Sequence, residues 1–262
     1  GILAGLIQPT AGRATVCGFD TQRQVSEVRK NIGIIPQEYL LYPEFSAYEF
    51  LDYMALLSGL DLSRQTIMRL LEEVNLASVA KKKIKSFSGG MKQRLVVAQA
   101  LVHDPQVLFA DEPTSGLDPV SAAALREDLQ NLAQQHGVTV FLTTHNLTEA
   151  EKLCQQVAVI RKGRLVTVGS PDELRLRQGG PHLEVVGRGF TESVILALRQ
   201  RPEVMGVSQN DRHLDIHLKD ESDTSGLVQL LVVNGVQIDE VRKGKASLEE
   251  VFLTLMEEEE HA

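Results

Sequence analysis

The fold is decided by two stretches, SFSGGMKQR at residues 86–94 and VLFADEPTSGLD at residues 107–118. In the first, Gly89 and Gly90 leave backbone amides free to approach an anion, and a helix that begins there points its positive end at the same place. In the second, a short apolar run predicts a buried strand that ends in Asp111 and Glu112. One of these carboxylates can bind a metal ion and the other can orient a water molecule, so the two stretches together predict a phosphate site.

Strands and helices alternate around these stretches. The uninterrupted apolar runs at 107–110 and 138–142 are typical of parallel strands, and a proline-initiated helix is predicted between them. Short apolar runs at 15–16 and 31–36, bounded by glycine and proline, predict two further strands. This alternation predicts an α/β domain built on a parallel sheet.

A mainly helical segment interrupts the alternation. Ser46 and Glu49 have the spacing of a capping box at the head of a helix over 47–57, and an amphipathic pattern predicts a second helix over 63–74. Together with the helix that follows Gly90, they predict a helical subdomain at about 46–103.

The best candidate for a domain boundary is the break in periodicity at 178–181, which contains two glycines and a proline. It divides an N-terminal domain, residues 1–178, from a smaller domain, residues 182–256. The order of elements predicted in the smaller domain is βαββαβ, which indicates a ferredoxin-like α+β sandwich, and a last helix is predicted to open with a box at Ser247–Glu250. The predicted elements are strands 183–186, 206–209, 214–218 and 238–242 and helices 192–201 and 225–233.

Composition excludes several classes of function. The 262 residues carry a net charge of -8, of which the acidic tail at 257–262 supplies half through Glu257–Glu260. The densest basic run, Lys81–Lys83, is too short to predict a nucleic-acid surface. Cys17 and Cys154 lie too far apart for a metal-type spacing, which favours a reducing cytoplasm. No apolar stretch approaches the roughly 20 residues that span a bilayer, so we expect any membrane role to depend on a partner.

Five short stretches follow one another along the chain: Ile35–Gln37, Ser88–Arg94, Val107–Glu112, Ser115–Asp118 and Thr143–His145. In order and spacing they resemble the Q-loop, signature motif, Walker B strand, D-loop and switch histidine of the ATP-binding cassette (ABC) ATPases. The likeness covers about residues 1–178 and implies a P-loop NTPase core of ABC type. The end of the chain, ASLEEVFL at residues 246–253, is similar to the accessory domain of daunorubicin-resistance-type export ATPases.

The resemblance implies roles for four side chains, with Gln37, Glu112 and His145 as catalytic residues and Asp111 and Gln37 as metal ligands. Asp111 would hold Mg²⁺, and Gln37 would offer an amide oxygen near the same ion. Glu112 would polarise the attacking water, and His145 would contact the γ-phosphate of ATP. Taken alone, an Asp-Glu pair at a strand end is more often a helix cap or a surface pair, and a lone histidine after a strand is more often structural.

The resemblance also implies that the site is shared between two copies of the chain. In the family, the signature segment contacts the nucleotide held by the opposite subunit, so Ser88, Gly89, Gly90 and Met91, with Asp118 of the D-loop, would bind ATP across a homodimer. One chain would then be half an enzyme. Glycines at a helix start are otherwise ordinary turn residues.

The chain begins after the place where the family carries its Walker A loop. Gly1–Leu6 is predicted to be the last turns of a helix that follows this loop, so the sequence is expected to be truncated at its N-terminus. The full-length protein is expected to be an ATPase, whereas the chain as given is expected to be inactive because it lacks the phosphate-binding lysine.

The resemblance implies a motor for an exporter. ATP-dependent dimerisation would drive a separate membrane permease, which would dock on the apolar segment 38–45, and the protein would lie at the cytoplasmic face of the membrane. Two alternatives remain open from the sequence. One is a non-transport ABC ATPase that acts on DNA or the ribosome, and the other is a nucleotide-free regulatory or interaction fragment.

Overall fold

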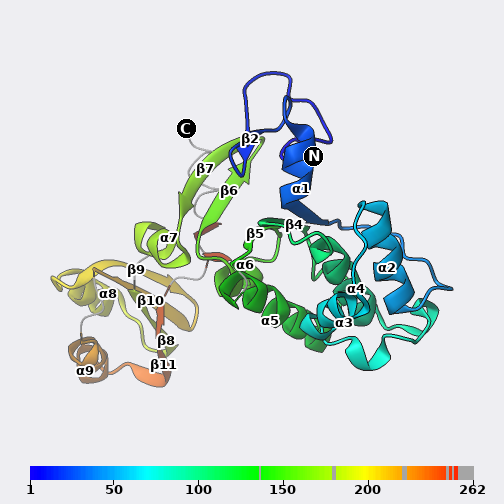
Figure 1. Ribbon diagram of the computed structural model, residues 1–262. Coiled ribbons are helices and arrows are strands. Elements are labelled where there is room, and N and C mark those ends of the chain that lie inside the picture. The colour runs from blue at the N-terminus through cyan, green and yellow to red at the C-terminus, as the bar shows by residue number, and fades with distance from the viewer. Residues whose placement is uncertain (136, 179–180, 220–222, 246–247, 250, 253–262) are drawn as a thin grey trace. The chain divides into compact units, whose positions relative to one another are not determined.

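The computed structural model describes residues 1–135, 137–178, 181–219, 223–245, 248, 249, 251 and 252 (Figure 1). They belong to two compact units, Gly1–His145 and Asn146–Ala262. The predicted box at Ser247–Glu250 and the acidic tail at 257–262 fall outside the described residues. The two units meet at residues 145 and 146, so residues 146–178 belong to the second unit and the domain boundary predicted at 178–181 stays a prediction.

The first unit is built on a parallel sheet with the strand order β3-β4-β5. Its strands are β3 (Ile32–Ile35), β4 (Val107–Asp111) and β5 (Thr139–Thr143). In the pairing register Ile35 lies beside Ala110, and Asp111 lies beside Thr143. The three strands therefore end at one edge of the sheet, and each is followed by a residue predicted to act in catalysis.

Helices α2 (Ala47–Leu57), α3 (Arg64–Glu73), α4 (Gly89–Leu101) and α5 (Pro119–Gln135) pack with this sheet around one core. The predicted capping box of α2 is confirmed, since the Glu49 amide donates to Ser46 Oγ at 3.2 Å and the Ser46 amide donates to Glu49 Oε2 at 2.6 Å. The remaining elements of the unit are β1 (Thr15–Val16), β2 (Phe19–Asp20), α1 (Val25–Asn31) and the 3₁₀ turns η1 (Ala77–Val79) and η2 (Ile84–Ser86).

The prediction for the first residues of the chain is wrong. Gly1–Leu6 forms hydrogen-bonded turns and no helix, with the Leu6 amide donating to the Gly1 carbonyl at 3.0 Å. Gly5 has a φ of 63°, which lies outside the right-handed helical region.

The second unit contains a hairpin and a larger sheet. The hairpin strands are β6 (Val157–Arg161) and β7 (Arg164–Gly169), and the helices beside them in the chain are α6 (Leu147–Leu153) and α7 (Pro171–Gln178). The larger sheet is antiparallel with the order β11-β8-β10-β9, which is the order of a ferredoxin-like sandwich and confirms that prediction. In chain order the sandwich consists of β8 (Pro181–Arg188), α8 (Glu192–Arg199), β9 (Val204–Asn210), β10 (His213–Leu218), α9 (Ser225–Val233) and β11 (Gln237–Lys245).

Candidate functional site

The candidate site lies at the edge of the first sheet where its parallel strands end. Gln37 stands two residues after β3, Glu112 directly follows β4, and His145 stands two residues after β5. Open α/β sheets bind their ligands outside these carboxyl ends. Because the three strands are parallel neighbours, residues up to 108 positions apart in the sequence meet at this edge of the sheet.

The Glu112 carboxylate is the centre of a hydrogen-bonded group. Gln37 Nε2 donates to Glu112 Oε2 at 3.1 Å, and His145 Nδ1 lies 2.8 Å from Glu112 Oε1. The Glu112 side chain is 26% exposed and that of His145 is 77% exposed, so the group is open to solvent on the histidine side. The structure thus brings together the three residues predicted to be catalytic, while their roles stay predictions.

The backbone conformation at Glu112 explains how the two adjacent carboxylates, Asp111 and Glu112, come to have different hydrogen-bond partners. Glu112 has a φ of 46°, a left-handed conformation that is uncommon for a residue other than glycine. Its amide donates to the Thr143 carbonyl at 3.0 Å, which holds the turned peptide against β5. The strand therefore ends abruptly, and the Asp111 and Glu112 side chains have different partners.

The Asp111 carboxylate has one oxygen held by the chain and one that could serve as a metal ligand. Thr143 Oγ1 donates a hydrogen bond to Asp111 Oδ1, and Oδ2 has no partner among the described residues. The described residues also contain no group of three or more His, Cys, Asp or Glu side chains arranged to hold a metal. One carboxylate oxygen and the Gln37 amide oxygen are hard ligands that suit Mg²⁺, which commonly uses one or two protein carboxylates and takes its other ligands from water and phosphate.

The predicted signature residues form a second group at the start of α4. Ser88 is the N-cap of this helix, because its Oγ accepts a hydrogen bond from the Met91 amide at 3.3 Å. A Cβ on Gly90 would lie 2.7 Å from Ser121 Oγ and 2.8 Å from Ser121 Cβ, whereas a Cβ on Gly89 would meet only a Leu117 methyl group at 3.8 Å. Gly90 is therefore required by packing within the chain, and Gly89 is not.

Asp118 caps the neighbouring helix α5. Its Oδ1 accepts from the Val120 and Ser121 amides at 3.1 and 3.0 Å, and its Oδ2 accepts from Ser121 Oγ at 2.6 Å. The Ser121 hydroxyl, followed by these amides, lowers the pKa of the Asp118 carboxyl. Both oxygens have partners within the chain, so the structure gives Asp118 a capping role and its contact with a nucleotide stays a prediction.

An ion pair between the signature helix α4 and a buried carboxylate of α5 was missed by the sequence reasoning. Asp128 on α5 is 6% exposed, and it accepts from Arg94 Nε at 2.8 Å and from Asn75 Nδ2 at 3.2 Å. Burial raises the pKa of the Asp128 carboxyl, and the Arg94 charge opposes this rise. A signal was present in the sequence, since Asp128 interrupts the apolar stripe formed by Leu125, Leu129 and Leu132.

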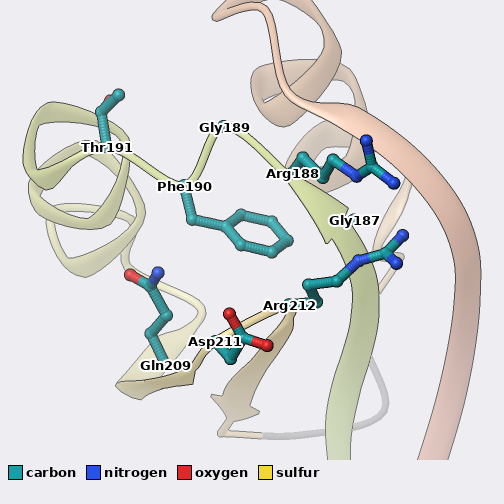
Figure 2. Close-up of a pocket in the computed structure, with 8 residues that line it drawn as sticks. All are labelled: Gly187, Arg188, Gly189, Phe190, Thr191, Gln209, Asp211 and Arg212. Carbon is teal, nitrogen blue, oxygen red and sulfur yellow. The ribbon is translucent and has the colours of Figure 1, made fainter.

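A cavity in the second unit contains none of the predicted site residues. Figure 2 shows the side chains of Arg188 and Arg212 extending toward β11, away from the Phe190 ring. There Arg212 forms an ion pair with Asp239 of β11. The cavity therefore does not gather its charges around one ligand position. Its lining residues are Gly187, Arg188, Gly189, Phe190, Thr191, Gln209, Asp211 and Arg212.

Within the part of the chain that the structure describes, no helix is long and apolar enough to cross a membrane. Residues 1–115 match the ABC transporter family, and residues 169–256 match the family described as ATP-binding protein DrrA1-3-like, C-terminal domain.

The chain is also similar to individual proteins over most of its length. It is 35% identical to the daunorubicin resistance ATP-binding protein DrrA3 of Streptomyces coeruleorubidus, over 97% of this chain and 81% of that protein. It is 31% identical to the linearmycin resistance ATP-binding protein LnrL of Bacillus subtilis strain 168, over 97% of this chain and 83% of that protein. A solved structure of the ATP-binding cassette MJ0796, a dimer in a post-hydrolysis state bound to ADP and Pi, matches with a TM-score of 0.56 and 24% identity, over 64% of this chain and 77% of that one.

Proposed function

This chain belongs to the ATP-binding proteins of ABC transporters, and on that premise we propose that it powers a drug exporter by hydrolysing ATP at the edge of the β3-β4-β5 sheet. The observation that carries the proposal is the meeting of Gln37, Glu112 and His145 at that edge. Both relatives quoted above are resistance proteins, and each matches 97% of the chain, which favours transport over a role on DNA or the ribosome.

We propose that ATP binds here together with Mg²⁺. Asp111 Oδ2 and the Gln37 amide oxygen would hold the ion, which neutralises charge on the phosphates when bound. The remaining chemistry asked of the chain is positioning. Glu112 would accept a hydrogen bond from the attacking water and orient it, and His145 would donate a hydrogen bond to a phosphate oxygen.

These roles are compatible with the hydrogen bonds that Glu112 already makes. Both oxygens of Glu112 already have partners, Gln37 on one side and His145 on the other. Gln37 can keep its Nε2 contact with Glu112 while its Oε1 faces the metal, and His145 can keep its Nδ1 contact while its Nε2 faces phosphate. Each Glu112 oxygen has a further lone pair that can accept a hydrogen bond from the attacking water.

We propose that a second copy of the chain completes the site with its signature segment. Ser88, Gly89, Gly90 and Met91 form the start of a 13-residue helix, α4, and backbone amides at a helix start are suited to phosphate. The helix dipole contributes only about 0.3–1 kcal/mol at an exposed site, so this segment serves as a contact that adds to the binding made at the sheet edge.

We propose that the membrane partner docks at the segment 38–45, as the resemblance implies. Within it, Leu40 is 94% exposed and Tyr42 is 47% exposed. The Tyr42 ring packs edge-on against Tyr53 of α2 with centroids 5.8 Å apart, which extends the apolar surface onto that helix. Exposed apolar side chains joined in one patch mark interaction surfaces, and a membrane permease would hold the protein at the cytoplasmic face of the membrane.

The direct test replaces Glu112 by Gln in the full-length protein. We expect the turnover number for ATP to fall by about 100- to 10,000-fold, because general base catalysis contributes that much, while ATP still binds. Glu72→Gln is the matched control, since Glu72 is an exposed glutamate at the end of α3. Undiminished turnover in Glu112→Gln would refute the assigned role.

A further inference from the structure

The geometry points to Thr143 as a positioning residue that fixes the Asp111 carboxylate, so that one oxygen is held by the chain and the other faces the metal. The inference rests on the proposed function, because it assigns a supporting residue to the same site. Thr143 is the last residue of β5 and Asp111 is the last residue of β4, and the two are partners in the parallel pairing register.

Two contacts tie Thr143 to the acidic pair. Its hydroxyl donates to Asp111 Oδ1, and its carbonyl accepts from the Glu112 amide at 3.0 Å. The side-chain contact restricts rotation of the Asp111 carboxylate, and the backbone contact holds the left-handed turn at Glu112. One residue therefore determines the directions in which both carboxylates leave the strand.

The Thr143 hydroxyl orients a side chain of the site and contributes little to the stability of the core. Thr143 and Asp111 are both exposed, so the hydrogen bond between them satisfies no buried polar group. An exposed pair of this kind contributes little to folding, whereas a group that orients a metal ligand typically changes metal affinity or activity by about 10- to 100-fold when removed. The position of this contact, next to the free oxygen of Asp111, gives it that second role.

The test uses Mn²⁺ as a probe for the Mg²⁺ site, with a non-hydrolysable ATP analogue and the full-length protein. Electron paramagnetic resonance measures the free Mn²⁺, and hence its dissociation constant, without any turnover. We expect Thr143→Val to raise this constant by about 10- to 100-fold. Thr143→Ser keeps the hydroxyl and should restore affinity near that of the natural protein.

Thr139→Val is the matched control. Thr139 is the first residue of β5, is exposed like Thr143, and pairs with Val107 in place of an acidic residue, so the same substitution there should leave Mn²⁺ binding unchanged. A second measurement is the Mg²⁺ dependence of ATP hydrolysis. Thr143→Val should raise the Mg²⁺ concentration needed for half-maximal rate, and saturating Mg²⁺ should recover most of the turnover number.

The outcomes separate the inference from the proposed function. If the natural protein binds Mn²⁺ with the nucleotide analogue and Thr143→Val binds it equally well, the positioning role is refuted and the ATPase proposal stands. If Thr143→Ser is as weak as Thr143→Val, the hydroxyl is not the cause and the inference also fails. If the natural protein binds no Mn²⁺ with the analogue, the proposed site itself is refuted.

Discussion

The two signature glycines should respond in opposite ways to the same substitution. Alanine at position 90 would place its Cβ 2.8 Å from Ser121 Cβ, closer than real Cβ atoms approach one another, and 2.7 Å from Ser121 Oγ. Ser121 cannot simply turn away, because its hydroxyl donates to Asp118 Oδ2 at 2.6 Å. Alanine at position 89 would meet only a methyl group at an ordinary distance of 3.8 Å.

The magnitudes follow from two opposing effects. Overpacking costs about 1–3 kcal/mol, and the contact of two fixed carbons places Gly90→Ala in the upper part of that range. Replacing glycine by alanine in a helix returns about 1 kcal/mol at most. We therefore expect the free energy of unfolding to fall by about 1–2 kcal/mol in Gly90→Ala, and to rise by up to about 1 kcal/mol in Gly89→Ala.

Urea-induced unfolding followed by circular dichroism measures both changes, provided the dependence on urea concentration keeps the same slope. The double variant Gly90→Ala with Ser121→Gly removes both clashing atoms, so its destabilisation should be smaller than the sum of the single effects by about 1–3 kcal/mol. Equal stability of Gly89→Ala and Gly90→Ala, or simple additivity with Ser121→Gly, would refute the packing argument. Because Gly89→Ala is tolerated by the fold, any loss of ATP hydrolysis in that variant reports on the approach of a ligand to the backbone.

Three further changes test other parts of the first unit. Hydrogen bonds from the Ser46 amide and side chain lower the pKa of Glu49 from 4.5 to about 2, so its contribution to stability is present above pH 4.5 and is lost as the pH falls toward 2. The difference in urea midpoint between the natural protein and Glu49→Gln should shrink over that window. Arg94→Met leaves the Asp128 carboxylate buried without its charged partner and should lower the free energy of unfolding by about 3–5 kcal/mol at neutral pH. Because burial raises the pKa of Asp128, this loss should diminish as acid protonates the carboxyl, and a constant loss down to pH 4 would contradict the assignment. Leu40→Ser should change the free energy of unfolding by less than about 0.5 kcal/mol and still reduce co-purification with the membrane subunit, whereas unchanged co-purification would argue against docking there.

Sequence reasoning located most elements of the first unit because local signals agreed with packing. Helix α2 begins and ends where the capping box and the apolar period predict, since Ser46 and Glu49 satisfy its first amides. Helix α1 was missed for the opposite reason. Its N-cap Gln24 makes no side-chain capping hydrogen bond to the helix, and Val28 is its only buried residue among those described. Neither a cap nor an apolar stripe in the sequence therefore predicts this helix.

The sequence predicted which residues meet at the candidate site, but it did not predict the contacts between them. Residues that follow parallel strands meet at one edge whatever their sequence separation, and this is why Gln37, Glu112 and His145 could be grouped. The pairing of Thr143 with Asp111 depends on the register between β4 and β5, which no local pattern specifies. The left-handed turn at Glu112 depends likewise on a hydrogen bond to a strand that begins 27 residues later.

The contacts at this edge divide into a fixed part and an adjustable part. Asp111 and Thr143 are held by their places in paired strands, so their geometry changes only if the sheet changes. Gln37 and His145 stand outside the strands and contact Glu112 through exposed side-chain hydrogen bonds, each with a net value of about 0.5–1.5 kcal/mol, or about 1.5–3 kcal/mol where a charge is involved. A triphosphate and its metal ion offer charged partners to both side chains and can therefore exceed this cost. On the proposed assignment, the edge of the sheet thus holds the metal ligand Asp111 rigidly, and it leaves the partners of Glu112 adjustable so that substrate can displace them.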